Sequence, residues 1–203
     1  MNEPVQPTKQ LFSFIFPGVR LNRSLRILIT VNSILVFVSG LFAPFYAVFI
    51  AHIGGSIAFA GLSWAIFSIV AGLLIFLFST LELKMKEPEL LIALGYVLRG
   101  VVFISYAYMT NLTQLIITQV LWGMATALGS PAFDSVYASH TSKENAIAEW
   151  GKWEGIAAIV TGLAALIGGI LIQTFGYTAI FMVMAVTSFG LGIYIWKLPR
   201  ELL

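Results

Sequence analysis

The sequence predicts an all-α integral membrane protein with six transmembrane helices. Hydrophobic residues make up 59% of the 203-residue chain and charged residues only 10%, whereas a soluble domain carries roughly 25% charged residues to cover its water-facing surface. The segments 27–81 and 155–196 contain no Asp, Glu, Lys or Arg. Each segment is long enough for two crossings, because one crossing takes about 20 apolar residues.

Breaks within the apolar stretches define the individual spans. The segment 52–56 contains paired glycines, which end helices and permit a tight turn. Thr110-Asn111 separates the third span from the fourth, and Phe175-Gly176-Tyr177 divides the last stretch. The predicted spans are residues 27–51, 57–81, 90–109, 112–138, 152–174 and 178–197. They form a transmembrane bundle over residues 27–198.

The bundle is preceded by an N-terminal segment, residues 1–26, and followed by a short tail, residues 199–203. A cleaved signal peptide has an apolar region of about 7–15 residues, and the first apolar run here is longer, so that interpretation is rejected. Apolar residues 11–16 precede Arg20, Arg23 and Arg26, a pattern that predicts an interfacial segment on anionic lipid. A disordered tail is the alternative.

Basic residues predict the orientation. Ten of the eleven Lys and Arg residues flank the spans on one side, and the loops after the first, third and fifth spans contain none. Because positively charged loops stay in the cytoplasm, we expect an inner-membrane protein whose two termini are both cytoplasmic.

An internal repeat relates the two halves of the chain. Residues 48–52 resemble residues 136–140 at an offset of 88, and Pro, Trp and Gly positions align at similar offsets. These pairs are Pro44 with Pro131, Trp64 with Trp153, and Gly72 with Gly162. The predicted repeats cover about residues 27–109 and 112–197. Since three spans are an odd number, the second unit is inverted in the membrane, giving a 3+3 inverted repeat typical of secondary transporters.

Several of these residues resemble the major facilitator superfamily, most strongly over residues 95–198. Gln119-Val-Leu-Trp-Gly followed by Pro131-Ala-Phe resembles its fourth helix, residues 143–148 its polar loop, and Gly168-Gly169 the end of its fifth helix. Gln119 stands where the family often has an Arg tied to proton coupling. The family's Gly-x-x-x-Asp-Arg loop is reduced in residues 79–86, and its Gly-Pro motif in helix five is missing. The family has about twelve helices in two halves, so the resemblance implies one six-helix bundle.

Polar and aromatic residues within the spans are the candidates for a solute site. Asn32, Gln119, Trp64 and Trp122 are the candidate substrate-binding residues. For the two amides, the alternative is hydrogen bonding between helices, worth about 0.6 kcal/mol on average in membranes. Trp153 is expected in the interfacial aromatic belt.

Charged residues within or near the spans form a second set of candidates. Arg99 lies about ten residues into the third span, where a charge costs roughly 2.5–3.5 kcal/mol on insertion scales. It is interpreted as a substrate or coupling charge, or else as a structural Arg bonded to carbonyls or reaching the interface. Asp134 and Glu154 are candidate gating residues that would form ion pairs with Lys143 or Lys152. Solvated charges are the alternative.

The leading hypothesis is a secondary transporter that moves a small solute across the lipid bilayer by alternating access. One bundle cannot rock against another, so a homodimer or a second six-helix half is the expected partner. A truncated or auxiliary membrane protein without transport activity is the alternative. The sequence has no P-loop, no HExxH motif and no cysteine, and we expect no enzyme activity, metal, cofactor or nucleic-acid partner.

The uneven distribution of Lys and Arg between the two sides of the membrane predicts the result of cysteine labelling in intact cells. Single cysteines at Gly54, Asn111 and Gly176 should react with an impermeant thiol reagent from outside the membrane. Cysteines at Lys84 and Lys143 should react only after permeabilisation. Reaction of the Lys143 position from outside would contradict the six-span arrangement.

Overall fold

The computed structural model describes residues 21–82, 87–199 and 202–203, and every regular element in them is a helix. The predicted interfacial segment, part of the reduced loop and part of the C-terminal tail lie outside the described residues. The elements are α2 (Arg23–Gly40), η1 (Ala43–Phe45), α3 (Tyr46–His52), α4 (Ile57–Glu82), α5 (Glu89–Ala107), α6 (Leu112–His140) and α7 (Ala146–Lys197).

Five helical stretches in the described residues are long and apolar enough to cross a membrane. They are Arg23–His52, Ile57–Phe78, Glu89–Ala107, Leu112–His140 and Ala146–Lys197. Their boundaries lie close to the predicted spans, except that the last two predicted spans fall in one element. The prediction of an all-α, multi-pass membrane protein is confirmed.

The first stretch, which the sequence predicts as one continuous helix, is bent near Pro44. α2 ends at Gly40, and Pro44 lies in the first turn of the short η1 helix that leads into α3. Proline fits a first helical turn because its missing N–H needs no partner there. The Leu41 N–H still donates to the Phe37 carbonyl at 3.1 Å, so the bend leaves this backbone donor satisfied.

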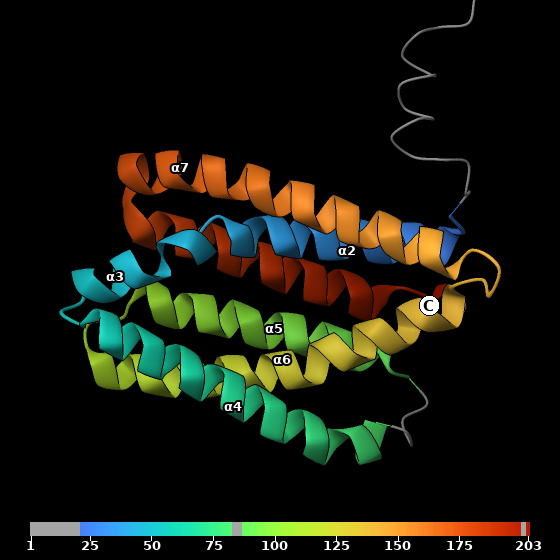
Figure 1. Ribbon diagram of the computed structural model, residues 1–203, viewed down its shortest axis with the longest axis horizontal. Coiled ribbons are helices and arrows are strands. Elements are labelled where there is room, and N and C mark those ends of the chain that lie inside the picture. Colours follow the sequence, from blue (N-terminus) through green and yellow to red (C-terminus); the bar gives the residue numbers. More distant parts are fainter. Residues whose placement is uncertain (1–20, 83–86, 200–201) are drawn as a thin grey trace, which may run out of the picture.

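The 52-residue helix α7 reverses direction within its length. A straight helix of that length would measure about 78 Å, more than twice the thickness of a bilayer's hydrocarbon core. Gly176 has non-helical backbone angles, with φ of 77° and ψ of 171°, in a region that favours glycine. Figure 1 shows α7 turning back on itself, and we name residues 146–175 its first arm and residues 177–197 its second arm.

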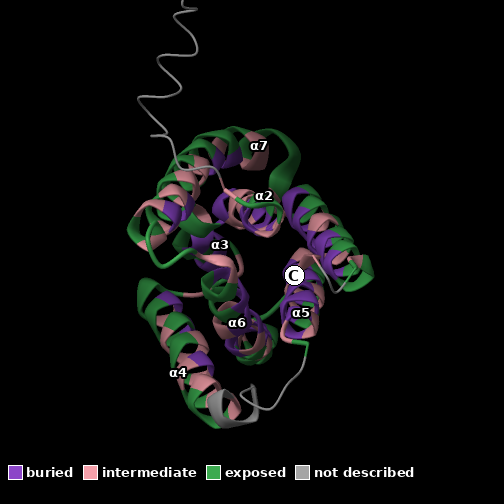
Figure 2. Ribbon diagram, turned by 90° about the vertical axis from the view of Figure 1, so that its right-hand side faces the viewer, coloured by how far each residue is buried: buried purple, intermediate pink, exposed green. Residues whose placement is uncertain are grey.

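The helices pack into a bundle whose buried faces turn toward its middle and whose exposed faces turn outward (Figure 2). α5 contacts both α6 and α7, α4 packs on α6, and α2 packs on α7. At several of these contacts, glycine lets the two helices come close together. A Cβ added at Gly123 would lie 2.7 Å from the Val70 side chain on α4, and one added at Gly192 would lie 2.8 Å from Val97 on α5.

The outer faces of α4 and of the first arm of α7 are apolar and uncovered. Ile69 and Leu73 on α4 are 61% and 59% exposed, and Leu166 and Ile170 on the first arm are 68% and 62% exposed. In water such faces would be unstable. They require lipid or another protein as their surroundings.

Two glycines of the first arm predict opposite responses to alanine. A Cβ at Gly168 would overlap the Leu41 carbonyl oxygen and lie 2.7 Å from the Leu41 Cα, whereas a Cβ at Gly162 would have no atom within 4 Å. Gly168→Ala should therefore destabilise the protein by about 1–3 kcal/mol through overpacking. Gly162→Ala should leave it unchanged or stabilise it by up to about 1 kcal/mol, because alanine favours helix. Thermal unfolding in detergent measures both, and equal melting temperatures would contradict the close approach of α2 and α7.

Candidate functional site

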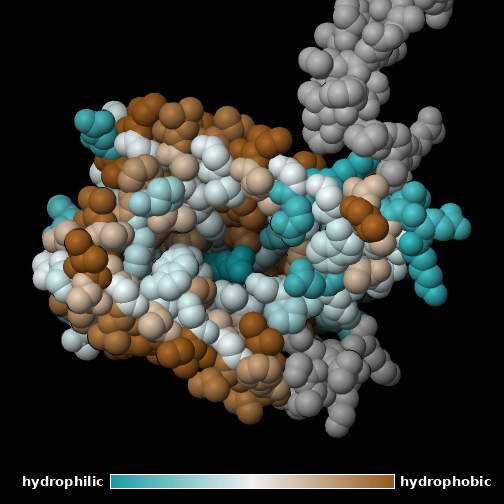
Figure 3. All heavy atoms as spheres, in the orientation of Figure 1, coloured by the Kyte–Doolittle hydropathy of each residue, from teal (hydrophilic) through white to brown (hydrophobic). Residues whose placement is uncertain are grey.

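A polar cavity of about 220 Å³ lies among α2, α5, α6 and the first arm of α7, and we name it the Arg99 cavity. Its lining residues are Asn32, Val36, Tyr96, Arg99, Gly129, Ser130, Phe133, Asp134 and Trp153. Figure 3 shows hydrophilic atoms at the bottom of a hollow in the middle of one face, between apolar edges formed over α7 and α4. A polar recess surrounded by apolar surface is the arrangement expected for a solute site within a membrane.

A close approach of two helix backbones positions the charge of this cavity. A Cβ at Gly95 would lie 2.8 Å from the Gly129 Cα and 3.0 Å from the Ala125 carbonyl oxygen, so only glycine lets α5 and α6 meet here. Arg99 follows Gly95 by four residues and therefore lies on the same face of α5, one turn further on. This places it beside Ser130, the neighbour of Gly129.

The Arg99 guanidinium group has few partners. Its Nη2 donates to the Ser130 hydroxyl at 3.5 Å, which is long for a hydrogen bond. Its Nε is buried and has no hydrogen-bond partner. Arginine carries five N–H donors and no acceptor, and a buried charged donor without a partner costs more than a neutral one. Among the described residues Arg99 bonds to the Ser130 hydroxyl of α6 and not to a backbone carbonyl, and its role stays a prediction.

Asn32 lies on the opposite wall of the same cavity. Its Oδ1 accepts a hydrogen bond of 3.0 Å from the Tyr96 hydroxyl, so α2 and α5 are joined across the cavity by two neutral polar groups. Tyr96 precedes Arg99 by three residues and shares its helix face. Tyr96 thus orients the Asn32 amide beside the charged group.

Gln119 does not line the Arg99 cavity but is buried in a separate polar cluster. Its Nε2 donates to the hydroxyls of Tyr46 and Tyr106 at 2.5 and 2.8 Å. The Tyr46 hydroxyl also shares a hydrogen bond of 2.6 Å with Ser63. These partners connect α3, α4, α5 and α6 through groups that satisfy one another, as a low-dielectric interior requires. These contacts are hydrogen bonds between helices, which the sequence offers as the alternative role of Gln119. A substrate contact for Gln119 stays a prediction.

Aromatic rings surround this polar cluster and fill the end of the bundle near α3. The Phe42 ring contacts the Phe181 ring at 4.7 Å and the Tyr106 ring at 5.5 Å between centroids. Phe49 contacts Tyr177 at 5.1 Å, next to the reversal of α7. Edge-to-face and tilted ring contacts stabilise aromatic cores, so α3, α5 and the start of the second arm pack as one layer.

The two predicted tryptophans lie at the edge of this aromatic layer. Trp64 is 48% exposed and contacts Tyr46 at 5.8 Å between ring centroids. Trp122 is half-buried and contacts Phe67 and Tyr106 at 5.5 and 5.8 Å. Their positions leave Trp64 able to meet a solute or a partner bundle, and their roles in binding stay predictions.

The two predicted gating carboxylates are both exposed. Asp134 lines the Arg99 cavity, and Glu154 follows Trp153, which lines the same cavity. They sit on α6 and on the first arm of α7, the helices on either side of the cavity. A gating role for either residue is still a prediction.

Three cavity residues were missed or placed differently by the sequence analysis. Tyr96 and Ser130 were not among the candidates, although the spacing of Tyr96 from Arg99 could have identified it. Trp153 was expected in the interfacial belt, yet it is 8% exposed and packs against Phe133 at 5.3 Å between ring centroids. The helical contact between α6 and the first arm buries it, and this contact is not visible in a single sequence.

The fold and the cavity define a class of protein. Several membrane-length helices surround a polar cavity with a charged side chain midway along α5, which is an arrangement expected of a membrane transport protein. Within the described residues no group of His, Cys, Asp or Glu is placed to hold a metal ion.

Comparison with known proteins identifies the family. The sequence profile of the Major Facilitator Superfamily matches residues 28–202, and the chain belongs to this family of transporters. It is also similar to a Bacillus subtilis (strain 168) protein described as an uncharacterized MFS-type transporter, YitZ. The two are 24% identical over 161 residues, which cover 79% of this chain and 98% of the relative.

Proposed function

We propose that this protein is one six-helix half of a secondary transporter, and that it moves a small solute carrying an anionic group across the inner membrane by alternating access. The observation that carries the proposal is the buried Arg99 Nε, which has no partner in the middle of the bundle. We propose no enzyme activity, because the chain belongs to a family of transporters.

Six crossings are supported by the reversal of α7. Its two arms hold 30 and 21 residues on either side of Gly176, and about 20 residues suffice for one crossing. With six crossings, the termini lie on the same side, which the basic residues assign to the cytoplasm. The bundle then covers residues 27–198, with repeats at about 27–109 and 112–197.

The helix contacts support the inverted repeat. In a 3+3 repeat, the first helix of each unit should meet the second helix of the other unit. Gly40 of α2 approaches Ala164 of the first arm, and Gly123 of α6 approaches Val70 of α4. The third helix of each unit should also meet its counterpart, and Gly192 of the second arm approaches Val97 of α5.

An anionic group is the ligand chemistry that fits Arg99. A guanidinium group binds carboxylate or phosphate through two parallel hydrogen bonds, and the free Nε together with a terminal nitrogen offers such a pair. The Ser130 hydroxyl and the Asn32 amide lie in the same cavity and can bind neutral polar parts of the solute. Asp134 and Glu154 would then gate the cavity, while Gln119, Trp64 and Trp122 would line the path beyond it.

A second bundle would complete the transport path. Gly72 on α4 and Gly162 on the first arm have no atom within 4 Å of an added Cβ, and small residues on an open face permit close packing of another helix. We propose a homodimer that meets across α4 and the first arm of α7 and encloses the Arg99 cavity. In the relative from Bacillus subtilis, 161 aligned residues cover 98% of the protein.

Substitution of Arg99 tests the proposed function. Purified protein is screened by thermal shift against small carboxylates and phosphate esters, since a ligand that binds the folded state raises the melting temperature. A stabilising anion should then be taken up by liposomes that contain the wild type. Arg99→Gln should weaken binding and uptake about 10- to 100-fold, because hydrogen bonds to charged groups are worth about 1.5–3 kcal/mol. Arg99→Lys should retain part of the binding.

Lys197→Gln is the matched control, because it removes one positive charge from the end of α7, outside the Arg99 cavity. It should bind and transport like the wild type. Stabilisation by neutral or cationic solutes alone would contradict the anionic substrate. Binding without uptake would favour the truncated or auxiliary protein.

A further inference from the structure

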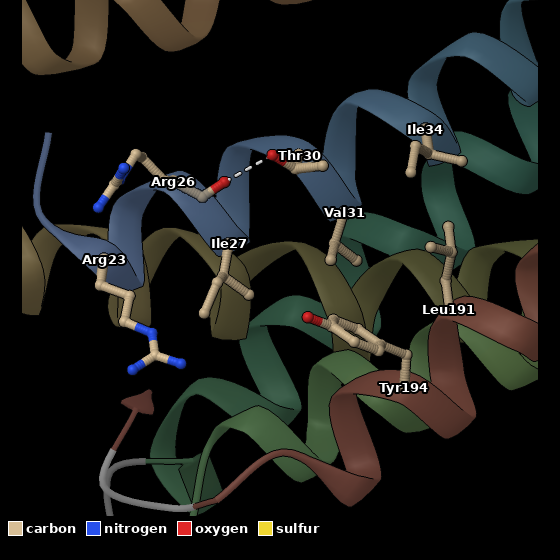
Figure 4. Close-up of a pocket in the computed structure, with 8 residues that line it drawn as sticks. All are labelled: Arg23, Arg26, Ile27, Thr30, Val31, Ile34, Leu191 and Tyr194. Atoms are coloured by element: carbon tan, nitrogen blue, oxygen red, sulfur yellow. Dashed lines mark hydrogen bonds between the residues drawn. The ribbon is translucent and has the colours of Figure 1, made fainter.

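A second cavity, of about 650 Å³, lies on the outer side of the bundle, away from the Arg99 cavity. It forms a groove between the N-terminal half of α2 and the second arm of α7, and we name it the α2–α7 groove (Figure 4). Its lining residues are Arg23, Arg26, Ile27, Thr30, Val31, Ile34, Leu191 and Tyr194. No residue of this groove lines the Arg99 cavity.

The groove is apolar along most of its length. Ile27, Val31 and Ile34 follow one face of α2, and Figure 4 shows Val31 and Ile34 on the side of Leu191. The Thr30 hydroxyl donates to the Arg26 carbonyl of its own helix at 2.8 Å, so it needs no partner in the groove. From residue 23 to residue 34, α2 rises about 16 Å, about half the thickness of a bilayer's hydrocarbon core.

The groove is positively charged at one end. Arg23 and Arg26 are both exposed and lie in the first turn of α2, which contains no acidic residue. Positive charges are unfavourable at a helix N-terminus, where the backbone already carries partial positive charge. Figure 4 shows the Tyr194 hydroxyl pointing toward Ile27, on the side of the groove that leads to Arg23. Figure 4 shows the Arg23 guanidinium group on the groove side of α2 and that of Arg26 on the other side of the helix. An anion at this end would offset the repulsion, accepting hydrogen bonds from Arg23 directly and from Arg26 after its side chain turns toward the groove.

We propose that the α2–α7 groove binds one anionic phospholipid, with the phosphate at Arg23 and Arg26 and an acyl chain along Ile27, Val31, Ile34 and Leu191. The ligand must be amphiphilic, because the groove joins a doubly charged end to an apolar channel. It must also be present at the membrane surface, where the ends of the spans lie. Ile34 and Tyr194 are 40% and 47% exposed, so the groove is open on its outer side and a lipid can enter from the bilayer.

The test measures lipid binding to the full-length protein purified in detergent. Native mass spectrometry and thermal shift are recorded with phosphatidylglycerol, phosphatidylethanolamine and inorganic phosphate. We expect one phosphatidylglycerol to stay bound and to raise the melting temperature, and we expect neither other compound to do so. The double variant Arg23→Gln/Arg26→Gln should bind phosphatidylglycerol at least about tenfold more weakly, since two charge-assisted hydrogen bonds are lost.

Two further variants make the result specific to the groove. Lys143→Gln/Lys152→Gln removes the same amount of charge outside the groove and should bind like the wild type. Leu191→Trp keeps both arginines but fills the apolar channel, and should lower phosphatidylglycerol affinity to a similar extent as the double arginine variant.

Equal affinity in the wild type and the double arginine variant would overturn the proposal, as would unchanged binding by Leu191→Trp. If phosphatidylglycerol bound only after residues 1–20 were deleted, the occupant of the groove would be the N-terminal segment and not a lipid, which would also overturn the proposal. Stabilisation by inorganic phosphate equal to that by phosphatidylglycerol would leave an anion site without a lipid and would also overturn it.

Discussion

A polar group inside a bilayer has no water to bind, and this constraint explains where the polar side chains of the bundle lie. The Gln119 NH2 group meets it, because two tyrosine hydroxyls accept its protons and Ser63 bonds to Tyr46 in turn. Arg99 does not meet it, because its Nε has no partner and its bond to Ser130 is long. The hydroxyls of Ser33 and Ser188 are also buried without a partner among the described residues, but Arg99 is the charged group of the three.

The contrast between these two sites follows from how the helices approach each other. At the end near α3, aromatic rings pack around the Gln119 cluster, and a cavity of about 340 Å³ lies beside Phe49, Tyr106 and Tyr177. In the middle of the bundle, Gly95 and Gly129 bring α5 and α6 together, and the cavity opens beside this contact. Aromatic packing near α3 and a polar cavity beside the Gly95–Gly129 contact make the two parts of the bundle different.

The sequence predicted the membrane helices well, because uncharged stretches and glycine turns are local features. It also predicted Arg99 as an exceptional charge, since any Arg at mid-span is costly. It did not predict the break of the first span near Pro44, nor the partners of the polar residues. Asn32 with Tyr96 and Gln119 with Tyr46 are 64 and 73 residues apart. Contacts at such separations depend on how the helices pack, and a single sequence gives no direct record of that packing.

The proposed homodimer would join two copies of this bundle across α4 and the first arm of α7. Because the chain has no cysteine, single cysteines can be introduced without a background. Cysteines at Gly72 and Gly162 lie on the proposed interface, and a cysteine at Leu94, which is 45% exposed on α5, lies outside it. Crosslinking in native membranes should give dimers at Gly72 and Gly162 and none at Leu94. Equal crosslinking at Leu94, or no dimer at any of the three positions, would contradict the account.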